Sequence, residues 1–240
     1  MPPAMPVVML PGLDGTGHLF EPFVAQVGNG LTPVVVRYPT DSPLGYAGLK
    51  PLVEAGLPAR APFVLLGESF SSPLAVRIAA EGNPHLAALI LVGGFVRSPA
   101  ATWLTSLRGL VRAGCFQMPP PVWAIRRFLA GPDAPAELVA AARAEIRAVS
   151  PAVLAHRVRE VLASDVREDL RRVHVPTLAL AGSQDRLVTS RAVDDLRVLG
   201  DLLEVEILDG PHLILQRQPA TAAAAIRGFL KRRAELAARD

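Results

Sequence analysis

Cysteine is nearly absent from this sequence. Cys115 is the single cysteine in 240 residues, so no intrachain disulfide can form. Disulfide frameworks belong to oxidising compartments, and a chain without one fits a reducing compartment. A free cysteine is among the most often buried residue types, so we expect Cys115 to fill a small apolar site between Gly114 and Phe116.

Long apolar runs are absent as well. No stretch approaches the ~20 consecutive apolar residues that a membrane-spanning helix needs, which predicts a protein without a membrane span. Residues 1–6 (MPPAMP) lack the basic segment and apolar core that are typical of a signal peptide. We therefore expect a soluble, cytoplasmic protein.

A strong charge of either sign is also missing. The formal net charge is only +3 and no nucleic-acid motif is present, so the sequence does not indicate a nucleic-acid partner. Half of the residues are apolar, enough to bury a substantial core without a metal or a disulfide. Since no internal repeat is found, the length predicts one domain, or one domain with an insertion.

Six short apolar runs predict β-strands. Each run is continuous rather than alternating, which is typical of strands that are covered on both faces, as in a parallel sheet. Helical patterns separate most of the runs, and this order predicts right-handed crossovers with helices on both faces of the sheet. The sequence thus predicts an α/β fold with a six-stranded parallel sheet, with strands at residues 7–10, 34–36, 63–66, 89–92, 178–181 and 203–208.

The segment 95–172 interrupts this alternation. It contains no convincing strand, and prolines separate its helical stretches. We predict a helical cap over the carboxyl edge of the sheet, where open α/β sheets bind ligands, with residues 1–94 and 173–240 as the core. Two serine–proline pairs predict an N-cap followed by a first-turn proline, at Ser42–Pro43 for the second helix and at Ser150–Pro151 inside the cap.

Ser69 is the candidate nucleophile. It lies between a predicted buried strand and a predicted helix, within Gly67-Glu68-Ser69-Phe70-Ser71. A nucleophile elbow needs a sharp strand-to-helix turn with small residues two before and two after the serine. The usual pattern is Gly-x-Ser-x-Gly, and here Ser71 occupies the last position.

A serine hydroxyl needs a base, and the base needs an orienting acid. His212 is the last histidine in the chain and follows the final predicted strand, so it matches the order serine, acid, histidine. Asp185 directly follows the penultimate strand and is the preferred acid. Asp209 remains an alternative, because it lies only three residues before His212.

Two backbone N–H groups are expected to form an oxyanion hole. One belongs to Phe70, at a helix N-terminus, and we assign the other to Leu13 in the glycine-rich loop 11–17. A dinucleotide site is the rival interpretation of this loop. A dinucleotide site would need the spacing Gly-x-Gly-x-x-Gly and an acidic residue at the end of the second strand. This loop reads Gly-x-x-Gly-x-Gly, and no acidic residue ends a suitable second strand, so the interpretation is rejected. We therefore expect no cofactor and no metal.

These motifs resemble the α/β-hydrolase superfamily in order and separation. The similar segments are residues 10–17, 67–71, 182–185 and 210–212, and the resemblance covers residues 7–230. It implies an α/β-hydrolase fold and a serine carboxylesterase that forms an acyl-enzyme. The loop has Pro11-Gly12 where many members have His-Gly, and the family's first antiparallel hairpin is missing, so we expect a wholly parallel sheet. A serine nucleophile argues against the epoxide hydrolases and haloalkane dehalogenases of this fold, which use aspartate.

The cap sequence suggests the substrate. We expect some of its bulky apolar side chains to line an acyl site for a small-molecule ester. The candidates are Trp103, Leu107, Trp123 and Phe128.

The cap also carries twelve arginines against seven acidic residues. This excess predicts an acidic partner. The chain resembles in this the esterases that act on a pimeloyl group carried by acyl carrier protein, so acyl carrier protein is the candidate partner. The candidate contacts are Arg126, Arg127, Arg157 and Arg159, and the alternative is an arginine-rich solvated surface. An acyltransferase, a perhydrolase, a thioesterase and a non-catalytic binding protein of this fold are further alternatives.

Overall fold

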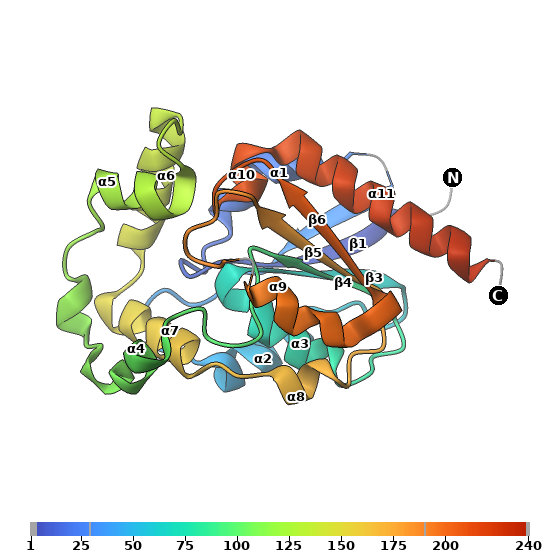
Figure 1. Cartoon of the computed structure of the whole chain (residues 1–240), viewed down its shortest axis with the longest axis horizontal. Helices are drawn as coiled ribbons and strands as arrows, with labels where there is room; N and C mark the ends of the chain where they lie inside the picture. Colours follow the sequence, from blue (N-terminus) through green and yellow to red (C-terminus); the bar gives the residue numbers. More distant parts are fainter. Residues whose placement is uncertain (1–3, 29, 190, 239–240) are drawn as a thin grey trace.

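The computed structural model describes residues 4–28, 30–189 and 191–238 and contains one six-stranded sheet. All neighbouring strands pair in parallel, in the order β2-β1-β3-β4-β5-β6. This confirms the predicted six-stranded parallel sheet (Figure 1). The strands are β1 (Met5–Leu10), β2 (Leu31–Val35), β3 (Phe63–Glu68), β4 (Leu86–Val92), β5 (Thr177–Gly182) and β6 (Leu203–Leu208).

The burial of each strand follows its position in the sheet. All six residues of β3 are buried, because strands and helices cover it on every side. The outer strands β2 and β6 are only partly buried. Pro33 lies in β2, and an edge strand tolerates a proline because the missing N–H faces away from the ladder.

Helices cover both faces of the sheet. The first core cluster packs Val8, Leu65 and Leu89 against α2 (Tyr46–Glu54), α3 (Ser72–Ala79), α8 (Arg167–Leu170) and α9 (Arg191–Leu196). The second packs the alternate strand positions against α1 (Glu21–Val24), α10 (Ile214–Arg217) and α11 (Pro219–Ala237). Figure 1 shows these two helical layers on opposite sides of the strands. No helix in the described ranges is long and apolar enough to cross a membrane.

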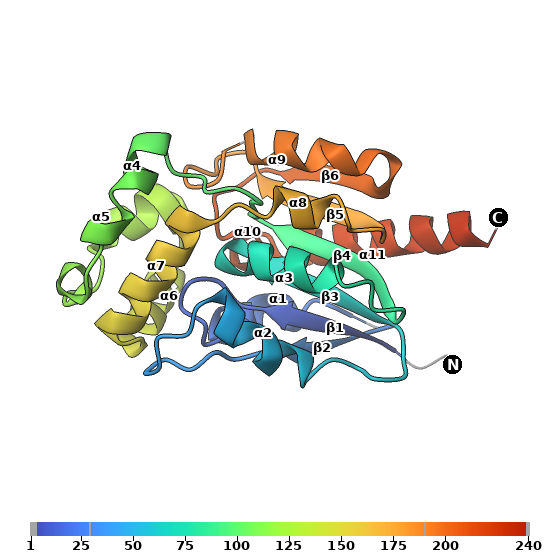
Figure 2. The same cartoon turned by 90° about the horizontal axis from the view of Figure 1, so that it is seen from below.

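Most of the segment 95–172 lies beyond the carboxyl ends of the strands (Figures 1 and 2). Its main helices are α4 (Thr102–Ser106), α5 (Val122–Ile125), α6 (Ala136–Ala148) and α7 (Pro151–Ala163). Short turns η3 (Arg108–Leu110), η4 (Ala113–Phe116) and η5 (Arg126–Ala130) connect them. The end of the segment returns to the sheet, since Val166 and Leu170 are buried in the first core cluster.

Three local expectations had different outcomes. Ser150 caps α7, because its Oγ accepts a hydrogen bond from Val153 N at 3.3 Å, as predicted. The predicted start at Ser42–Pro43 is wrong: α2 begins at Tyr46, whose N–H donates to Glu160 Oε2 on α7 at 3.0 Å. Cys115 is exposed rather than buried, whereas its neighbour Phe116 packs against the small cluster of Val149, Val153 and Leu154.

Candidate active site

Ser69 lies on a strained turn at the end of β3. It has a φ of 48° and is the only non-glycine residue with positive φ in the part of the chain that the structure describes. Such a conformation is costly and persists where the surrounding structure imposes it. Gly67 permits the turn, because a Cβ there would lie 2.8 Å from the Cβ of Ala75 on α3. The strand and helix therefore approach closely and hold the Ser69 hydroxyl at the carboxyl edge of the sheet.

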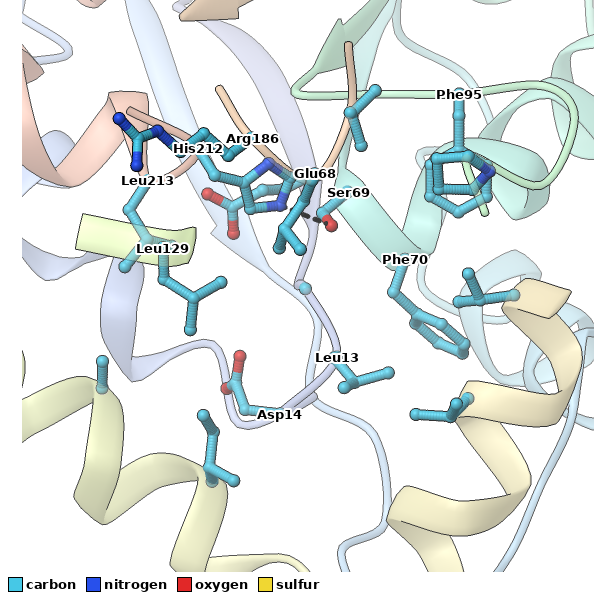
Figure 3. Close-up of a pocket in the computed structure, with 18 of the residues that line it drawn as sticks. Leu13, Asp14, Glu68, Ser69, Phe70, Phe95, Leu129, Arg186, His212 and Leu213 are labelled. Carbon is cyan, nitrogen blue, oxygen red and sulfur yellow. Dashed lines mark hydrogen bonds between the residues drawn. The ribbon is translucent and has the colours of Figure 1, made fainter. Parts of the chain in front are cut away.

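A chain of hydrogen bonds joins Ser69, His212 and Asp185. His212 Nε2 lies 2.8 Å from Ser69 Oγ (Figure 3). His212 Nδ1 lies 2.6 Å from Asp185 Oδ2. Asp185 Oδ1 accepts the N–H groups of Leu187 and Val188 at 2.8 and 2.9 Å. The side chains of His212 and Asp185 are only 4% and 2% exposed, so little water competes for these bonds. The sequence-predicted triad residues thus lie within hydrogen-bond distance of one another.

Glycines allow the turn that contains Asp185 and the turn that contains His212 to approach closely. A Cβ on Gly182 would lie 2.3 Å from Pro211 O, so the two loops touch backbone to backbone. A Cβ on Gly93 would lie 3.1 Å from His212 Cε1, so the imidazole packs directly on the end of β4. The alternative acid, Asp209, bonds instead to Ser183 Oγ and Gln184 Nε2 at 2.9 and 3.0 Å.

The two predicted oxyanion donors lie beside Ser69 on the cavity wall (Figure 3). Phe70 belongs to the first helical turn after β3, where N–H groups have no intrahelical partner. Leu13 follows β1, and its N–H has no acceptor within the described ranges. Both N–H groups are therefore available to a ligand oxygen.

Ser71 occupies the position of the missing glycine of the elbow. Its Oγ donates to Pro11 O in the oxyanion loop and accepts a hydrogen bond from Tyr38 at 2.8 Å. Burial raises the pKa of the Tyr38 phenol, so this hydroxyl keeps its proton and can donate. Ser71, which replaces the last glycine of the Gly-x-Ser-x-Gly pattern, thus links the elbow to the loop 11–17.

Two buried carboxyl groups lie at the oxyanion loop (residues 11–17), one from β3 and one from the loop itself, and sequence reasoning missed both. Glu68 Oε1 accepts from Gln216 Nε2 at 3.0 Å, and burial raises the pKa of Glu68 from 4.5 to about 7. Asp14 Oδ1 accepts the N–H and hydroxyl of Thr16 at 2.9 and 2.6 Å. A charged residue that closes the otherwise apolar run of β3 was the signal that could have identified Glu68.

Arg157 reaches from α7 into the same loop. Its Nη1 donates to Leu13 O and Asp14 O, both at 2.8 Å, and its Nη2 donates to Pro39 O at 2.9 Å. The guanidinium lies over the Tyr38 and Phe70 rings, 5.7 and 5.8 Å from their centroids. Arg157 is only 1% exposed, so the prediction that it binds a partner protein is wrong: both of its Nη groups donate to backbone carbonyls inside the protein.

The other predicted partner-binding arginines differ in their surroundings. Arg126 Nη1 donates to Pro132 O and Ala134 O, and Arg159 Nη1 donates to Val111 O. Arg127 is exposed, and its guanidinium lies 5.3 Å from the centroid of the Phe128 ring. The four arginines therefore do not form one common surface.

Ser69 and His212 open into a cavity of about 330 Å³. The core supplies Leu13, Phe70 and Leu213, and helices α6 and α7 supply most of the facing wall. The apolar lining makes the cavity suited to a hydrocarbon group. It consists of Leu13, Leu19, Phe70, Phe95, Pro99, Ala100, Leu129, Ala142, Ile146, Val158, Val161, Leu162, Leu187, Val188 and Leu213.

The residues predicted to bind substrate do not line this cavity. Trp103, Leu107, Trp123 and Phe128 are 65%, 43%, 66% and 38% exposed. The prediction that these four residues bind substrate is wrong: α6 and α7 contribute to the cavity wall, whereas no described side chain of α4 or α5 does. A second cavity of about 860 Å³ adjoins the first, and the two share Pro99, Ala100 and Leu162.

Solved structures of known proteins share this fold. MenH from S. aureus superposes with a TM-score of 0.77 at 18% identity, over 95% of this chain and 94% of that one. A thermophilic esterase from Thermogutta terrifontis superposes with a TM-score of 0.76 at 19% identity, over 96% of this chain and 90% of that one. The enol-lactonase from Burkholderia xenovorans LB400 superposes with a TM-score of 0.73 at 16% identity, over 95% of this chain and 92% of that one. Identities this low show the fold alone.

No curated protein matches the sequence significantly. The family model described as "Alpha/beta hydrolase family", however, matches residues 7–225, which include the oxyanion loop, the elbow and the His212 turn. The match spans most of the chain and agrees with the parallel sheet. The chain therefore belongs to the alpha/beta hydrolase family.

Proposed function

We propose that the protein is a serine hydrolase that cleaves carboxylic esters through an acyl-enzyme on Ser69. The hydrogen-bond chain from Ser69 through His212 to Asp185 carries the proposal, because each member has the neighbour that its role requires. Ser69 is the nucleophile, His212 the general base and Asp185 the group that orients the imidazole.

The reaction follows from this geometry. Ser69 Oγ attacks the ester carbonyl while His212 Nε2 takes the hydroxyl proton, and the N–H groups of Leu13 and Phe70 stabilise the negative oxygen. The tetrahedral intermediate expels the alcohol, which receives the proton from His212 and leaves the acyl group on Ser69. Water then attacks the acyl-enzyme, with His212 again as base, and the carboxylic acid is released.

The cavity indicates the substrate class. Its apolar lining and volume of about 330 Å³ fit an aliphatic or aromatic acyl group. The adjoining cavity is lined in part by Ser98, Thr189 and Asp195, and it offers space for a more polar leaving group. An acyl carrier protein is not part of this proposal, because the buried Arg157 is unavailable to a partner.

Two measurements test the proposal. A fluorophosphonate should label the protein covalently, and Ser69→Ala should abolish the labelling. A chain-length series of p-nitrophenyl esters should show turnover with a preference for apolar acyl groups. Absence of both labelling and turnover in the folded protein would refute the proposal.

A matched pair of variants tests the assignment of the acid. Asp185→Asn should lower kcat by about a thousandfold or more, because the imidazole loses its orienting carboxylate. Asp209→Asn removes a nearby carboxylate that does not contact His212, so it should retain activity. Equal losses in the two variants would contradict the assignment. Product analysis with competing alcohols, thiols or peroxide separates a hydrolase from an acyltransferase or a perhydrolase.

A further inference from the structure

Large apolar side chains are concentrated on the outer surface of the segment 95–172. Half of the fourteen large hydrophobic residues that are exposed in the described ranges fall between positions 103 and 128. Monomeric soluble proteins rarely expose a large apolar patch, and such a patch commonly marks an interaction site. We call this surface the basic apolar face; its apolar members are Trp103, Leu107, Leu110, Met118, Val122, Trp123 and Phe128.

The face lies at one end of the molecule. Figures 1 and 2 place α4 and α5 at the end opposite the C-terminal part of α11. Trp103, Trp123 and Met118 are 65%, 66% and 82% exposed, so they do not belong to the core. None of the seven apolar residues lines either of the two cavities, so acyl binding does not explain their presence.

Positive charge surrounds these apolar side chains. Residues 97–132 contain five arginines and no aspartate or glutamate. Arg97 is paired with Asp195, and Arg126 is held by backbone carbonyls. Arg108, Arg112 and Arg127 are exposed and form no ion pair with any described residue, so their charges are available to an anionic partner.

The chemistry of the face selects its occupant. A second copy of this chain is disfavoured, because a symmetric interface would bring the same arginines together, and residues 97–132 contain no acidic residue to pair with them. The face consists of short helices and turns, and its apolar side chains line neither cavity, so they do not present a preformed site for a peptide. Exposed tryptophans flanked by arginines suit the boundary between acyl chains and anionic headgroups.

We propose that the basic apolar face docks on an anionic lipid surface. Trp103, Trp123 and their apolar neighbours enter the interfacial region of the membrane, and Arg108, Arg112 and Arg127 contact the phosphate groups. The protein remains peripheral, since no described helix is suited to span the bilayer. This inference is independent of the chemistry at Ser69.

The tryptophans provide a direct assay. The chain has two, Trp103 and Trp123, and both lie on the face, so all tryptophan emission reports on it. Adding vesicles of phosphatidylglycerol and phosphatidylcholine in equal parts should shift the emission to shorter wavelength and carry the full-length protein into the pellet. Phosphatidylcholine vesicles should do neither. High salt should weaken the binding, because headgroup attraction is screened.

Charge reversal tests the basic component. The double variant Arg112→Glu and Arg127→Glu should lower vesicle affinity by at least about tenfold, since each basic residue near an anionic surface contributes about fivefold. The matched control reverses Arg60, in the loop between α2 and β3, and Lys231 on α11; both are exposed, and this variant should bind like the wild type. Trp123→Ser should also weaken binding. Because these residues are exposed, circular dichroism and thermal unfolding should show that every variant is folded.

Specific results would overturn the proposal. Failure to bind the anionic vesicles, or equal affinity for the anionic and neutral vesicles, would do so. Unchanged binding by the Arg112/Arg127 double variant would do the same. Capture of an acidic polypeptide such as polyglutamate without vesicle binding would assign the face to a protein partner instead. Hydrolysis of soluble esters is measured separately, so failure of the lipid proposal and failure of the esterase proposal are distinguishable.

Discussion

Replacing Glu68 by glutamine should remove a pH-dependent part of the stability. Glu68 is buried between Gln216 and the oxyanion loop, and burial is the main reason that its pKa rises from 4.5 to about 7. The nearby Asp14 carboxylate raises the pKa further, whereas the Gln216 amide and the Gly12 N–H oppose the rise.

The sign follows from proton linkage. Because the folded protein holds the Glu68 proton more tightly than the unfolded chain does, the free energy of unfolding decreases as pH rises between about 4.5 and about 7. Each tenfold difference in proton affinity corresponds to about 1.4 kcal/mol, so this group contributes at most about 3 kcal/mol below pH 4.5, and that contribution is lost above pH 7. Glutamine keeps the size and an acceptor for Gln216 but does not titrate.

Urea unfolding between pH 4.5 and 8 measures the effect. The difference in unfolding free energy between the wild type and Glu68→Gln should change by about 3 kcal/mol across this range in favour of the variant at high pH. Other titrating groups cancel in the difference. The control Glu21→Gln alters an exposed glutamate and should show little dependence. A difference for Glu68→Gln that stays constant with pH would refute the reasoning.

Substitutions at three further positions test the packing around Ser69. Gly67→Ala should lower the unfolding free energy by about 1–3 kcal/mol, because the new Cβ overpacks against Ala75; unchanged thermal unfolding would contradict this. Ser71→Ala should cost about 1–3 kcal/mol in urea unfolding, because it leaves two buried hydrogen-bonding groups without their partner; a neutral effect would show that the elbow and the oxyanion loop are not linked. Arg157→Met should lower kcat by about tenfold to hundredfold with little change in KM, because the peptide of Leu13 loses its orientation, and Arg157→Lys should restore part of the rate. A raised KM with unchanged kcat would assign Arg157 to substrate binding instead.

Local sequence patterns were sufficient for the sheet and for the identity of the candidate triad. Continuous apolar runs report burial on both faces, so the six strands could be predicted without tertiary information. Chain order places the ends of β3, β5 and β6 at one edge of a parallel sheet, and Ser69, Asp185 and His212 follow those three strands. The choice of Asp185 over Asp209 was already favoured by this order.

Only the tertiary structure decided which side chains are buried and where they point. Arg157 and Arg127 are both arginines of the segment 95–172, and nothing in the sequence distinguished them. Arg157 is buried and donates to backbone carbonyls, whereas Arg127 is exposed to solvent. Glu68 and Ser71 form hydrogen bonds with residues of distant segments. Trp103 and Trp123 are exposed and do not line the cavity that they were predicted to line. Periodicity describes one element at a time, whereas burial depends on the facing surface of another, and that surface comes from residues far away in the chain.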